Sequence, residues 1–386
     1  MGIGGCGASA LYHLAKRGVH AIGIDRFEPG HDRGSSHGDT RVIRQAYFEH
    51  PDYVPLLLRA YDGWRNLENE TGTKLLDLCG LLLLGPPKGE ILRGARLAMK
   101  RHGAPLETVD RNDFRHRFPA IALPEEFEAA WEPLGGYLKV EDCVRSYARR
   151  AVELGAELRT GESILTWSAG EGGVRVETDR AIYEADRLVL CPGAWAPTLL
   201  PGIAERAQIK ILRKVLLWYP RQSEEASLPG HTFFAELPYG AFYGFPCLDG
   251  QTVKLAEHTG GDSVAEPLQL DRGRRETDSI GPDRFVGEVL PGLRVEATRH
   301  AVCMYTMTRD AHFLLDHHPD HPNVVFAAGF SGHGFKFMSA LGEILSELAI
   351  DGHTPSPIDF LSIDRFPPRA LTTRADARIR QLGSSK

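Results

Sequence analysis

The sequence predicts an α/β protein of two domains, a Rossmann-like nucleotide-binding domain and a second domain built on an antiparallel sheet. A glycine loop with the spacing Gly2-x-Gly4-x-x-Gly7 opens the chain, and a strand, a glycine turn and a helix follow near its other end. Between them, segments rich in β-branched and aromatic residues fill 209–307, which indicates antiparallel strands. With 386 residues and 42% hydrophobic content, the chain is large enough to bury two such cores.

The glycine loop predicts contact with a dinucleotide, because its glycines permit a tight turn, close approach of a pyrophosphate and close helix packing. Residues 8–17 read as a helix and 20–24 as a strand ending at Asp25, whose carboxylate suits a ribose hydroxyl. The alternative is an ordinary glycine turn with a solvent-facing aspartate. The chain begins inside the loop, without the first strand of the βαβ unit. We therefore expect the natural product to carry further apolar residues before Met1.

Composition favours a small-molecule partner. The net charge is -6 and no long basic run occurs, which argues against nucleic acid and anionic membranes. The richest apolar run, 81–84, is far shorter than the roughly 18 residues of a membrane span, and no signal peptide precedes the loop, so we expect a cytoplasmic protein without a membrane partner. The six cysteines are scattered without CxxC pairs. This argues against a zinc site or a disulfide framework and predicts mostly buried thiols.

The stretch 27–44 is polar and contains two arginines three residues apart, Arg41 and Arg44. If Asp39 or Thr40 opens a helix there, both guanidinium groups lie on one helix face and could point into one pocket. A solvated basic turn is the alternative interpretation.

Hydrophobic periodicity predicts the remaining elements in order. Helices are expected at 51–71, 89–102 and 142–155, and strands at 75–84, 129–140, 157–166, 174–178, 181–186 and 187–191. The last of these strands runs into Gly193, which lets backbone approach a ligand. Further strands are expected at 209–219, 232–236, 241–245, 253–256, 301–306 and 323–330, then a helix at 339–350 and a loosely ordered tail beyond 369.

Four stretches carry a resemblance to a known family: 36–41 (SHGDTR), 243–246 (YGFP), 301–306 (AVCMYT) and 329–337 (GFSGHGFKF). At these residues the chain resembles the monomeric sarcosine oxidase and N-methyltryptophan oxidase family of covalent flavoenzymes, from the glycine loop to about residue 365. The resemblance implies a glutathione-reductase-like fold of the D-amino-acid-oxidase type. The discontinuous FAD-binding domain would comprise 1–75, 141–203 and 310–386, and the substrate domain 76–140 and 204–309.

The resemblance also implies the cofactor contacts. Cys303 matches the cysteine joined by a thioether to the 8α carbon of FAD, whereas without the family it would read as a buried small hydrophobe. The turn 332–336 would present N–H groups and the positive end of a helix to the flavin. The other expected cofactor residues are Gly2, Gly4, Gly7, Asp25, His37, Arg41, Gly193, Trp195, Gly332, Gly334 and Lys336.

The substrate site follows from the same resemblance. Arg44 and Lys336 match a clamp for the substrate carboxylate, and Tyr243 and Tyr305 are expected to contact the substrate. Lys254 matches the lysine that assists oxygen. The expected catalytic residues are Lys254, Arg41, His258, Tyr243 and His333. For Lys336 a surface lysine is the alternative, and for His258 a structural histidine.

The sequence thus predicts a monomeric FAD oxidase that uses O2 to demethylate an N-methyl amino acid, releasing formaldehyde, the primary amino acid and H2O2. Glu257 departs from the tyrosine or lysine usual beside the matching histidine, so the side-chain pocket and the substrate's size stay open. The alternatives are an FAD dehydrogenase or cyclic imino-acid oxidase acting on proline or pipecolate, and a non-catalytic flavin-binding remnant. A nicotinamide dehydrogenase would leave Cys303 without a role.

Overall fold

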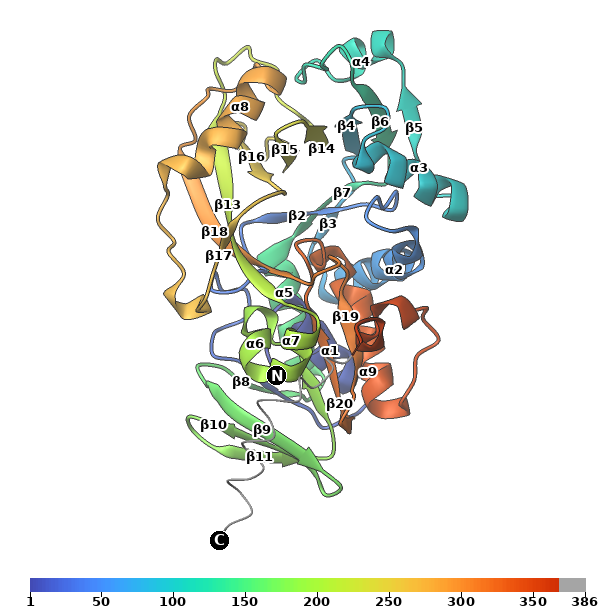
Figure 1. The fold of residues 1–386 in the computed structure, drawn as a ribbon, viewed down its shortest axis with the longest axis vertical. Coiled ribbons are helices and arrows are strands. Elements are labelled where there is room, and N and C mark those ends of the chain that lie inside the picture. Colours follow the sequence, from blue (N-terminus) through green and yellow to red (C-terminus); the bar gives the residue numbers. More distant parts are fainter. Residues whose placement is uncertain (368–386) are drawn as a thin grey trace, which may run out of the picture.

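Two groups of sheets are stacked along the long axis of the molecule in the computed structural model, which describes residues 1–367 (Figure 1). The expected loose tail beyond 369 lies outside the described residues. The end that holds the glycine loop is built around α1 (Gly5–Lys16), which begins directly after Gly4 and packs between α5 (Val140–Glu153) and α9 (Met338–Asp351). Helix α2 (Val54–Thr71) covers α9.

Short parallel pairs surround α1. Strand β1 (Ile22–Ile24) pairs in parallel with β8 (Glu157–Arg159), and β12 (Leu188–Leu190) pairs in parallel with β20 (His321–Ala328). On its other side, β20 pairs antiparallel with β19 (Leu314–His318). The first residues lie between these groups, because Gly2 N donates to Ile24 O at 2.9 Å and Cys191 N donates to Met1 O at 2.9 Å. Strands β9 (Ile164–Gly170), β10 (Gly173–Thr178) and β11 (Ile182–Ala185) form a separate antiparallel sheet at the lower end of Figure 1.

A nine-stranded sheet dominates the other end of the described structure, in the order β17-β13-β16-β15-β14-β4-β6-β5 with β18 paired to β13. Its strands are β4 (Leu81–Gly85), β5 (Glu107–Val109), β6 (Glu128–Glu132), β13 (Lys210–Pro220), β14 (Thr232–Leu237), β15 (Gly240–Gly244), β16 (Thr252–Glu257), β17 (Asp262–Ser263) and β18 (Arg299–Met307). Helix α3 (Glu90–His102) packs near β4 and β14, α4 (Arg111–Arg117) near β6, and α8 (Ile280–Val289) near β15 and β16. The short helices α6 (Ala196–Leu199) and α7 (Pro201–Arg206) precede β13.

A small central sheet of β2 (Thr40–Ile43), β7 (Gly136–Lys139) and β3 (Leu76–Asp77) lies between the two ends. The single strands expected at 75–84, 129–140 and 157–166 are wrong, because each is two strands that belong to different sheets. Gly80 separates the first pair with φ of +84°, and a Cβ there would lie 1.9 Å from the Trp131 ring. This close packing could not be read from periodicity.

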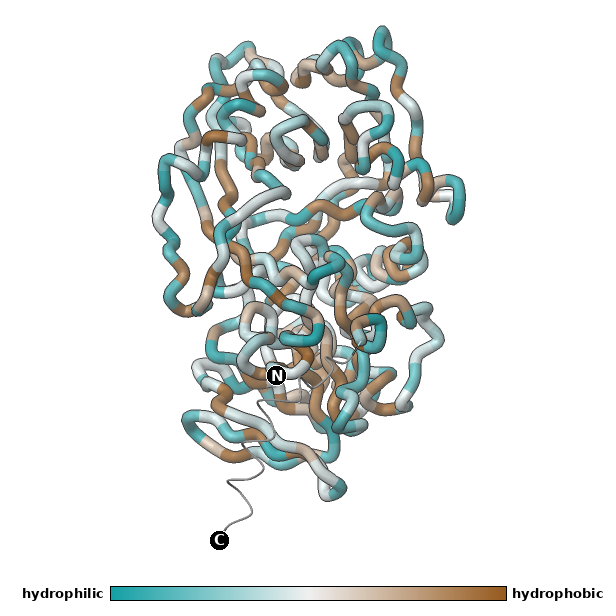
Figure 2. The backbone as a smooth tube through the Cα atoms, in the orientation of Figure 1, coloured by the Kyte–Doolittle hydropathy of each residue, from teal (hydrophilic) through white to brown (hydrophobic). Residues whose placement is uncertain are grey.

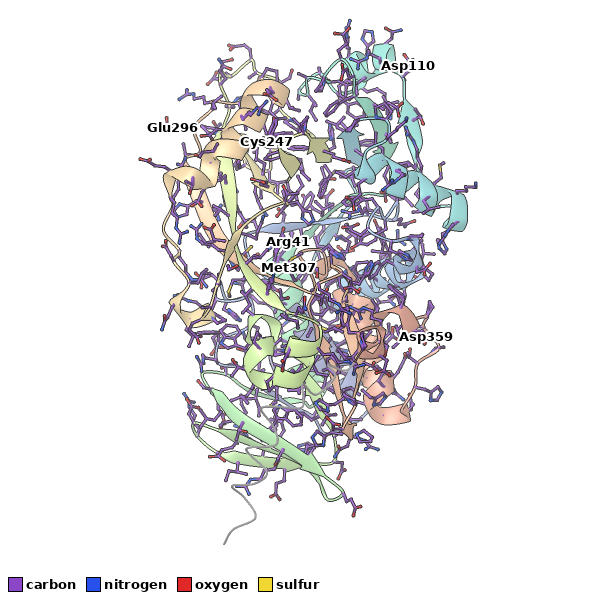
Figure 3. The ribbon with its side chains drawn as sticks, viewed as in Figure 1. Arg41, Asp110, Cys247, Glu296, Met307 and Asp359 are labelled. Atoms are coloured by element: carbon purple, nitrogen blue, oxygen red, sulfur yellow. The ribbon has the colours of Figure 1, made fainter. Side chains whose placement is uncertain are left out.

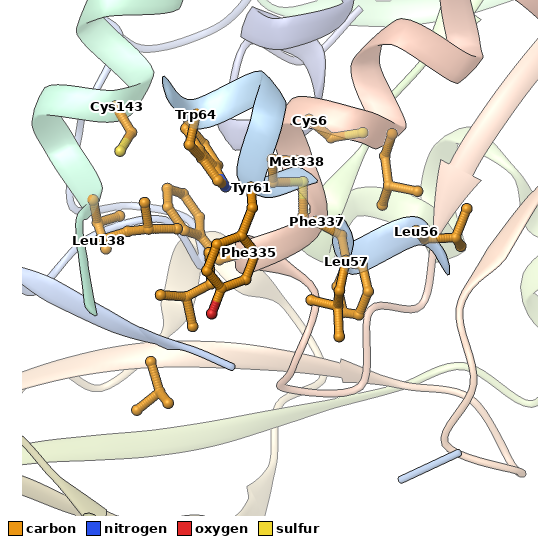
Figure 4. Packing of buried hydrophobic residues seen from close by; sticks show 14 of the residues in the cluster. Cys6, Leu56, Leu57, Tyr61, Trp64, Leu138, Cys143, Phe335, Phe337 and Met338 are labelled. Carbon is orange, nitrogen blue, oxygen red and sulfur yellow. The ribbon is translucent and has the colours of Figure 1, made fainter. Parts of the chain in front are cut away.

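The core residues follow the brown segments of the chain in Figure 2, which concentrate in the strands and in α9. Near the glycine loop, Trp64 of α2 stacks on Phe335 at 5.9 Å between ring centroids and donates from Nε1 to the Lys336 carbonyl at 2.8 Å (Figure 4). Because an aromatic pair and a buried hydrogen bond meet there, α2 holds the 332–336 turn in place.

Two composition-based expectations concern the described residues directly. All six cysteines are unpaired, but only Cys6, Cys143 and Cys303 are buried, so half rather than most are buried thiols. No helix among the described residues has both the length and the apolar character of a membrane span.

Candidate active site

One cavity of about 250 Å³ runs from the glycine loop into the centre of the molecule. Its lining at one end includes Gly2, Gly4 and Gly7, and at the other end Arg44 and Lys336. Segments far apart in sequence, from the start of the chain to its last third, thus contribute to the same space. The remaining expected site residues in the lining are Asp25, Arg41, Gly193, Trp195, Tyr243, His258, Tyr305, Gly332, His333 and Gly334.

The glycine loop leaves room where a nucleotide phosphate would approach. A Cβ on Gly7 would lie 1.7 Å from Gly2 O, so this glycine is required by the loop itself. A Cβ on Gly4 would meet only Ser36 Oγ, at 3.9 Å, so the Gly4 backbone is open toward the cavity. Helix α1 has neither a side-chain N-cap nor an acidic residue in its first turn. Its positive N-terminal end can therefore hold an anion, and these residues fit the pyrophosphate of FAD.

Asp25 closes the loop from the other side. Its Oδ2 accepts from Ile3 N at 2.5 Å and its Oδ1 accepts from Phe27 N at 2.8 Å. Each carboxylate oxygen keeps a second lone pair for a ribose hydroxyl, and the Phe27 and Trp195 rings lie nearby at 6.2 Å between centroids. This end of the cavity therefore combines a buried acid with aromatic surface.

The helix that would place Arg41 and Arg44 on one face is not formed, because residues Thr40–Ile43 form strand β2 paired antiparallel with β7. The β-branched residues of this segment favour a strand, and side chains three apart on a strand point to opposite faces. Both arginines still line the cavity. Arg41, near the centre of Figure 3, donates to Thr40 O at 2.9 Å and Ser35 O at 2.8 Å.

Arg44 is 1% exposed, and its Nη2 donates to both carboxylate oxygens of Glu49, a residue that sequence reasoning missed. Its guanidinium also lies 4.0 Å from the Phe48 ring centroid. Although burial by itself opposes ionisation of Glu49, the Arg44 charge brings the pKa of Glu49 down to about 2. The arginine is thus held ready by an acid that a substrate carboxylate must displace or share. The sequence signal that could have identified Glu49 is an acidic residue five positions after Arg44, the arginine expected in the clamp.

Lys336 lies beside this pair and is 5% exposed. Its ammonium donates to His333 O at 2.8 Å, and burial, with Arg44 nearby, lowers the pKa of Lys336 well below its usual range. His333 has both ring nitrogens engaged: Nε2 donates to Ala311 O at 2.9 Å, so Nδ1 accepts from the Tyr47 hydroxyl. This arrangement fixes the His333 tautomer and leaves neither nitrogen free to transfer a proton.

Aromatic rings form the wall between Arg44 and the middle of the cavity. Phe234 stacks with Tyr243 at 5.8 Å and meets His258 edge-on at 5.4 Å between centroids. The Tyr305 hydroxyl lies 3.5 Å from both Tyr243 Oη and His258 Nδ1. Burial lowers the pKa of His258 to about 3, so the imidazole is neutral at physiological pH.

Three expected site residues do not line the cavity. His37 is buried with Nε2 unpartnered, and burial lowers its pKa to about 3. Lys254 directs its ammonium at Gly38 O, Thr40 O and Thr40 Oγ1, the last two at 2.8 and 2.9 Å. Cys303 is 1% exposed on β18, opposite Lys214 of β13. All three are buried.

Cys303 lies in a cationic environment. Four basic side chains surround it, those of Arg41, Lys214, Lys254 and Arg272. Among the described residues no group of three or more metal-ligating side chains is found.

Residues 1–348 match the family model DAO, FAD dependent oxidoreductase. The match spans the glycine loop, the central sheet and the 332–336 turn that together bound the cavity. The chain belongs to this family of FAD-dependent oxidoreductases.

Named relatives narrow the class. The chain is 40% identical over 373 residues to monomeric sarcosine oxidase of Bacillus sp. strain B-0618, covering 95% of each chain. It is 33% identical over 371 residues to N-methyl-L-tryptophan oxidase of Yersinia pestis strain Pestoides F, covering 95% and 98%. Both relatives are aligned over almost their whole length.

Solved structures agree with the fold. NikD, an unusual amino acid oxidase essential for nikkomycin biosynthesis, superposes with a TM-score of 0.82 at 24% identity, over 94% of this chain and 95% of that one. L-proline dehydrogenase from P. horikoshii superposes with a TM-score of 0.81 at 22% identity, over 95% and 96%. At these identities the likeness establishes the expected FAD-oxidase fold and nothing finer.

Proposed function

We propose that this chain is an FAD-dependent oxidase that demethylates N-methyl amino acids. The substrate, O2 and water would give the primary amino acid, formaldehyde and H2O2. The observation that carries the proposal is the single cavity that joins the glycine cradle to two buried basic side chains, Arg44 and Lys336. The sarcosine oxidase and N-methyltryptophan oxidase relatives support this substrate class.

The residues of the chain would bind and orient the substrate. FAD would supply the oxidising group, accepting a hydride equivalent from the carbon bonded to the substrate nitrogen. Arg44 and Lys336 would hold the carboxylate, Arg44 by paired hydrogen bonds and Lys336 as a point charge. Tyr243, Tyr305 and the neutral His258 would surround the amine and keep water away from it.

The decisive experiment is a panel of N-methyl amino acids, from sarcosine to N-methyl-L-tryptophan, assayed for peroxide and for formaldehyde. We expect both products in equal amounts, and bleaching of the flavin absorbance when the same substrates are added without oxygen. Peroxide without formaldehyde from proline or pipecolate would instead identify a cyclic imino-acid oxidase. Dye reduction without oxygen consumption would identify a dehydrogenase, and absence of flavin a non-catalytic remnant.

We further propose that FAD is attached covalently through Cys303. Support comes from its buried position beside Tyr305 and from the basic side chains around it. Protein precipitated with acid should remain yellow, whereas a Cys303→Ser variant should release its flavin into the supernatant. The buried Cys143, changed to Ser, is the matched control and should keep a yellow pellet. A colourless wild-type pellet would contradict the attachment.

The domain division, subunit state and compartment are also proposals. We infer an FAD-binding domain of 1–75, 141–203 and 310–386 and a substrate domain of 76–140 and 204–309. A monomer is supported by the name of the sarcosine oxidase relatives, and a cytoplasmic site by six unpaired cysteines. Light scattering at micromolar concentration tests the monomeric state, since the mass of a dimer would refute it.

A further inference from the structure

Glu132 is a carboxyl group that the proposed reaction does not use. It lies on β6 with a side chain that is 0% exposed, and its Oε2 has no hydrogen-bond partner. Its Oε1 accepts from the backbone N of Gln45, the residue that follows Arg44. A fully buried carboxyl with one unpartnered oxygen is costly, and its place beside Arg44 points to a role in the clamp.

The surroundings of Glu132 contain few groups that could balance a negative charge. Arg44 is the cationic side chain that faces it, and the Arg44 Nε is itself buried without a partner. From α2, Tyr61 faces it, but the Tyr61 hydroxyl donates to Leu134 O at 2.6 Å. Across the strand pair lies the apolar Leu81. Burial raises the pKa of Glu132 to about 7, which Arg44 and the backbone N–H groups only partly oppose.

We propose that Glu132 is a positioning residue that takes up a proton when Arg44 binds the substrate carboxylate. Glu49 already neutralises Arg44, so a substrate carboxylate brings a second negative charge to the same guanidinium. A third negative charge, on Glu132, would be repelled by these two carboxylates in a site of low dielectric constant. Neutral Glu132 still accepts the Gln45 N–H bond, which keeps the backbone that carries Arg44 in place. The inference rests on the proposed function only in assigning Arg44 to the carboxylate.

The test uses butyrate, which replaces the sarcosine nitrogen by carbon and so has no amine to titrate. Binding to the flavin-loaded enzyme is measured from the flavin spectrum between pH 6 and 9. We expect the Kd to be constant below about pH 7 and to rise by up to roughly tenfold per pH unit above it, since binding takes up one proton. The Glu132→Gln variant, which keeps an acceptor oxygen but cannot ionise, should show a flat profile. If the Kd of the Glu132→Gln variant depended on pH as that of the wild type does, the proposal would be overturned.

The matched control is Glu128→Gln, on the same strand but partly exposed and paired with Arg96. It should keep the wild-type profile, and a flat profile there would overturn the assignment. Lys336 is the other group that could take up the proton, because burial also lowers its pKa. A Lys336→Arg variant cannot titrate in this range, so a persistent pH dependence supports Glu132 and a lost one assigns the proton to Lys336. The measurement on the Lys336→Arg variant remains informative even if the Glu132→Gln variant does not fold.

The binding assay and the turnover assay fail independently. Butyrate binding requires no oxidation, so pH-dependent binding without formaldehyde release would refute the proposed reaction and leave the role of Glu132 intact. Formaldehyde release with a flat butyrate profile would do the reverse. Calorimetry in buffers of different ionisation enthalpy counts directly the protons taken up when butyrate binds. We expect net proton uptake for the wild type near pH 7 and less for the Glu132→Gln variant.

Discussion

At the scale of single residues, the candidate site is defined by how Arg44 is held. The family resemblance predicted that Arg44 and Lys336 act together, and both line the same cavity. What the sequence did not predict is that Arg44 is already paired with Glu49 and stacked against Phe48. The guanidinium is therefore preorganised, and substrate binding would bring a second carboxylate to a side chain that Glu49 already holds.

Removing the Arg44 guanidinium should weaken substrate binding and leave the cofactor in place. For Arg44→Ala we expect KM for an N-methyl amino acid to rise roughly ten- to a hundredfold, since hydrogen bonds to charged groups are worth about 1.5–3 kcal/mol. Steady-state kinetics and the flavin-to-protein absorbance ratio measure the two effects. The change also leaves Glu49 buried and unpaired, so the Arg44→Ala/Glu49→Gln double variant is needed as a control. An unchanged KM in both variants would remove Arg44 from the clamp.

The pocket wall gives a second prediction at this scale. Phe234 separates Arg44 from His258 and Tyr243, so its ring limits the space for a substrate side chain. Phe234→Ala should raise kcat/KM for N-methyl-L-tryptophan relative to that for sarcosine. The ratio of the two constants is the measurement. The buried Phe233 neighbour, whose ring packs on Phe285 away from the cavity, is the control when changed to Ala, and an equal shift there would indicate general loosening.

At the scale of elements, the loop and helix that open the chain are set by local sequence. Glycine spacing and the run of small residues after it predicted both the loop and α1, and the strand ending at Asp25 is also found as β1. Strand β2 shows the opposite case. Its two arginines suggested a helix face, but pairing with β7, almost a hundred residues away, makes it a strand.

Two glycines of the loop should respond differently to an added methyl group. Gly4→Ala fits the protein, because the new Cβ meets only Ser36 Oγ at 3.9 Å, so it should lower flavin content with little change in Tm. Gly7→Ala places its Cβ 1.7 Å from Gly2 O and should lower both. Flavin absorbance and thermal unfolding give the two values. Gly202→Ala, with nothing within 4 Å, is the control, and full flavin content in Gly4→Ala would refute the pyrophosphate cradle.

At the scale of the whole molecule, buried polar contacts join the nine-stranded sheet to the nucleotide end. Lys254 of β16 donates to the carbonyls of Gly38 and Thr40, residues at the start of the central sheet. This contact places the strand that carries Arg41 against the wall formed by β13, β16 and β18. The family resemblance implies a second role for Lys254, which is to assist the reduction of O2.

The Lys254→Met variant separates these two roles. If its charge assists oxygen, anaerobic flavin reduction should stay within a few-fold of wild type while reoxidation by O2 slows by roughly a hundredfold or more. Stopped-flow absorbance measures the two half-reactions separately. Loss of flavin or of folded protein, with normal reoxidation of whatever flavin remains, would show that the lysine serves only to join the sheets.

The sequence by itself determined the family, the glycine loop, most helices and strands, and two basic residues, Arg44 and Lys336, that line one cavity. Each depends on local spacing or on short motifs that survive without knowledge of the partner segments. It also predicted Cys303, Lys254 and His37 as site residues, and none of the three is among the residues that line the cavity. Their side-chain positions depend on which strands pair, and periodicity does not specify that.

Only the tertiary structure decided which strands share a sheet, and therefore which charges meet. The strands around Gly80 belong to two sheets, and Gly80 lies between them with a positive φ and with the Trp131 ring in the space that a side chain would need. Glu132, 88 residues from Arg44, reaches it only because β6 ends beside the backbone after β2. An isolated carboxyl in a strand carries no local signal, because its burial and its pKa are set by residues brought close when the chain folds.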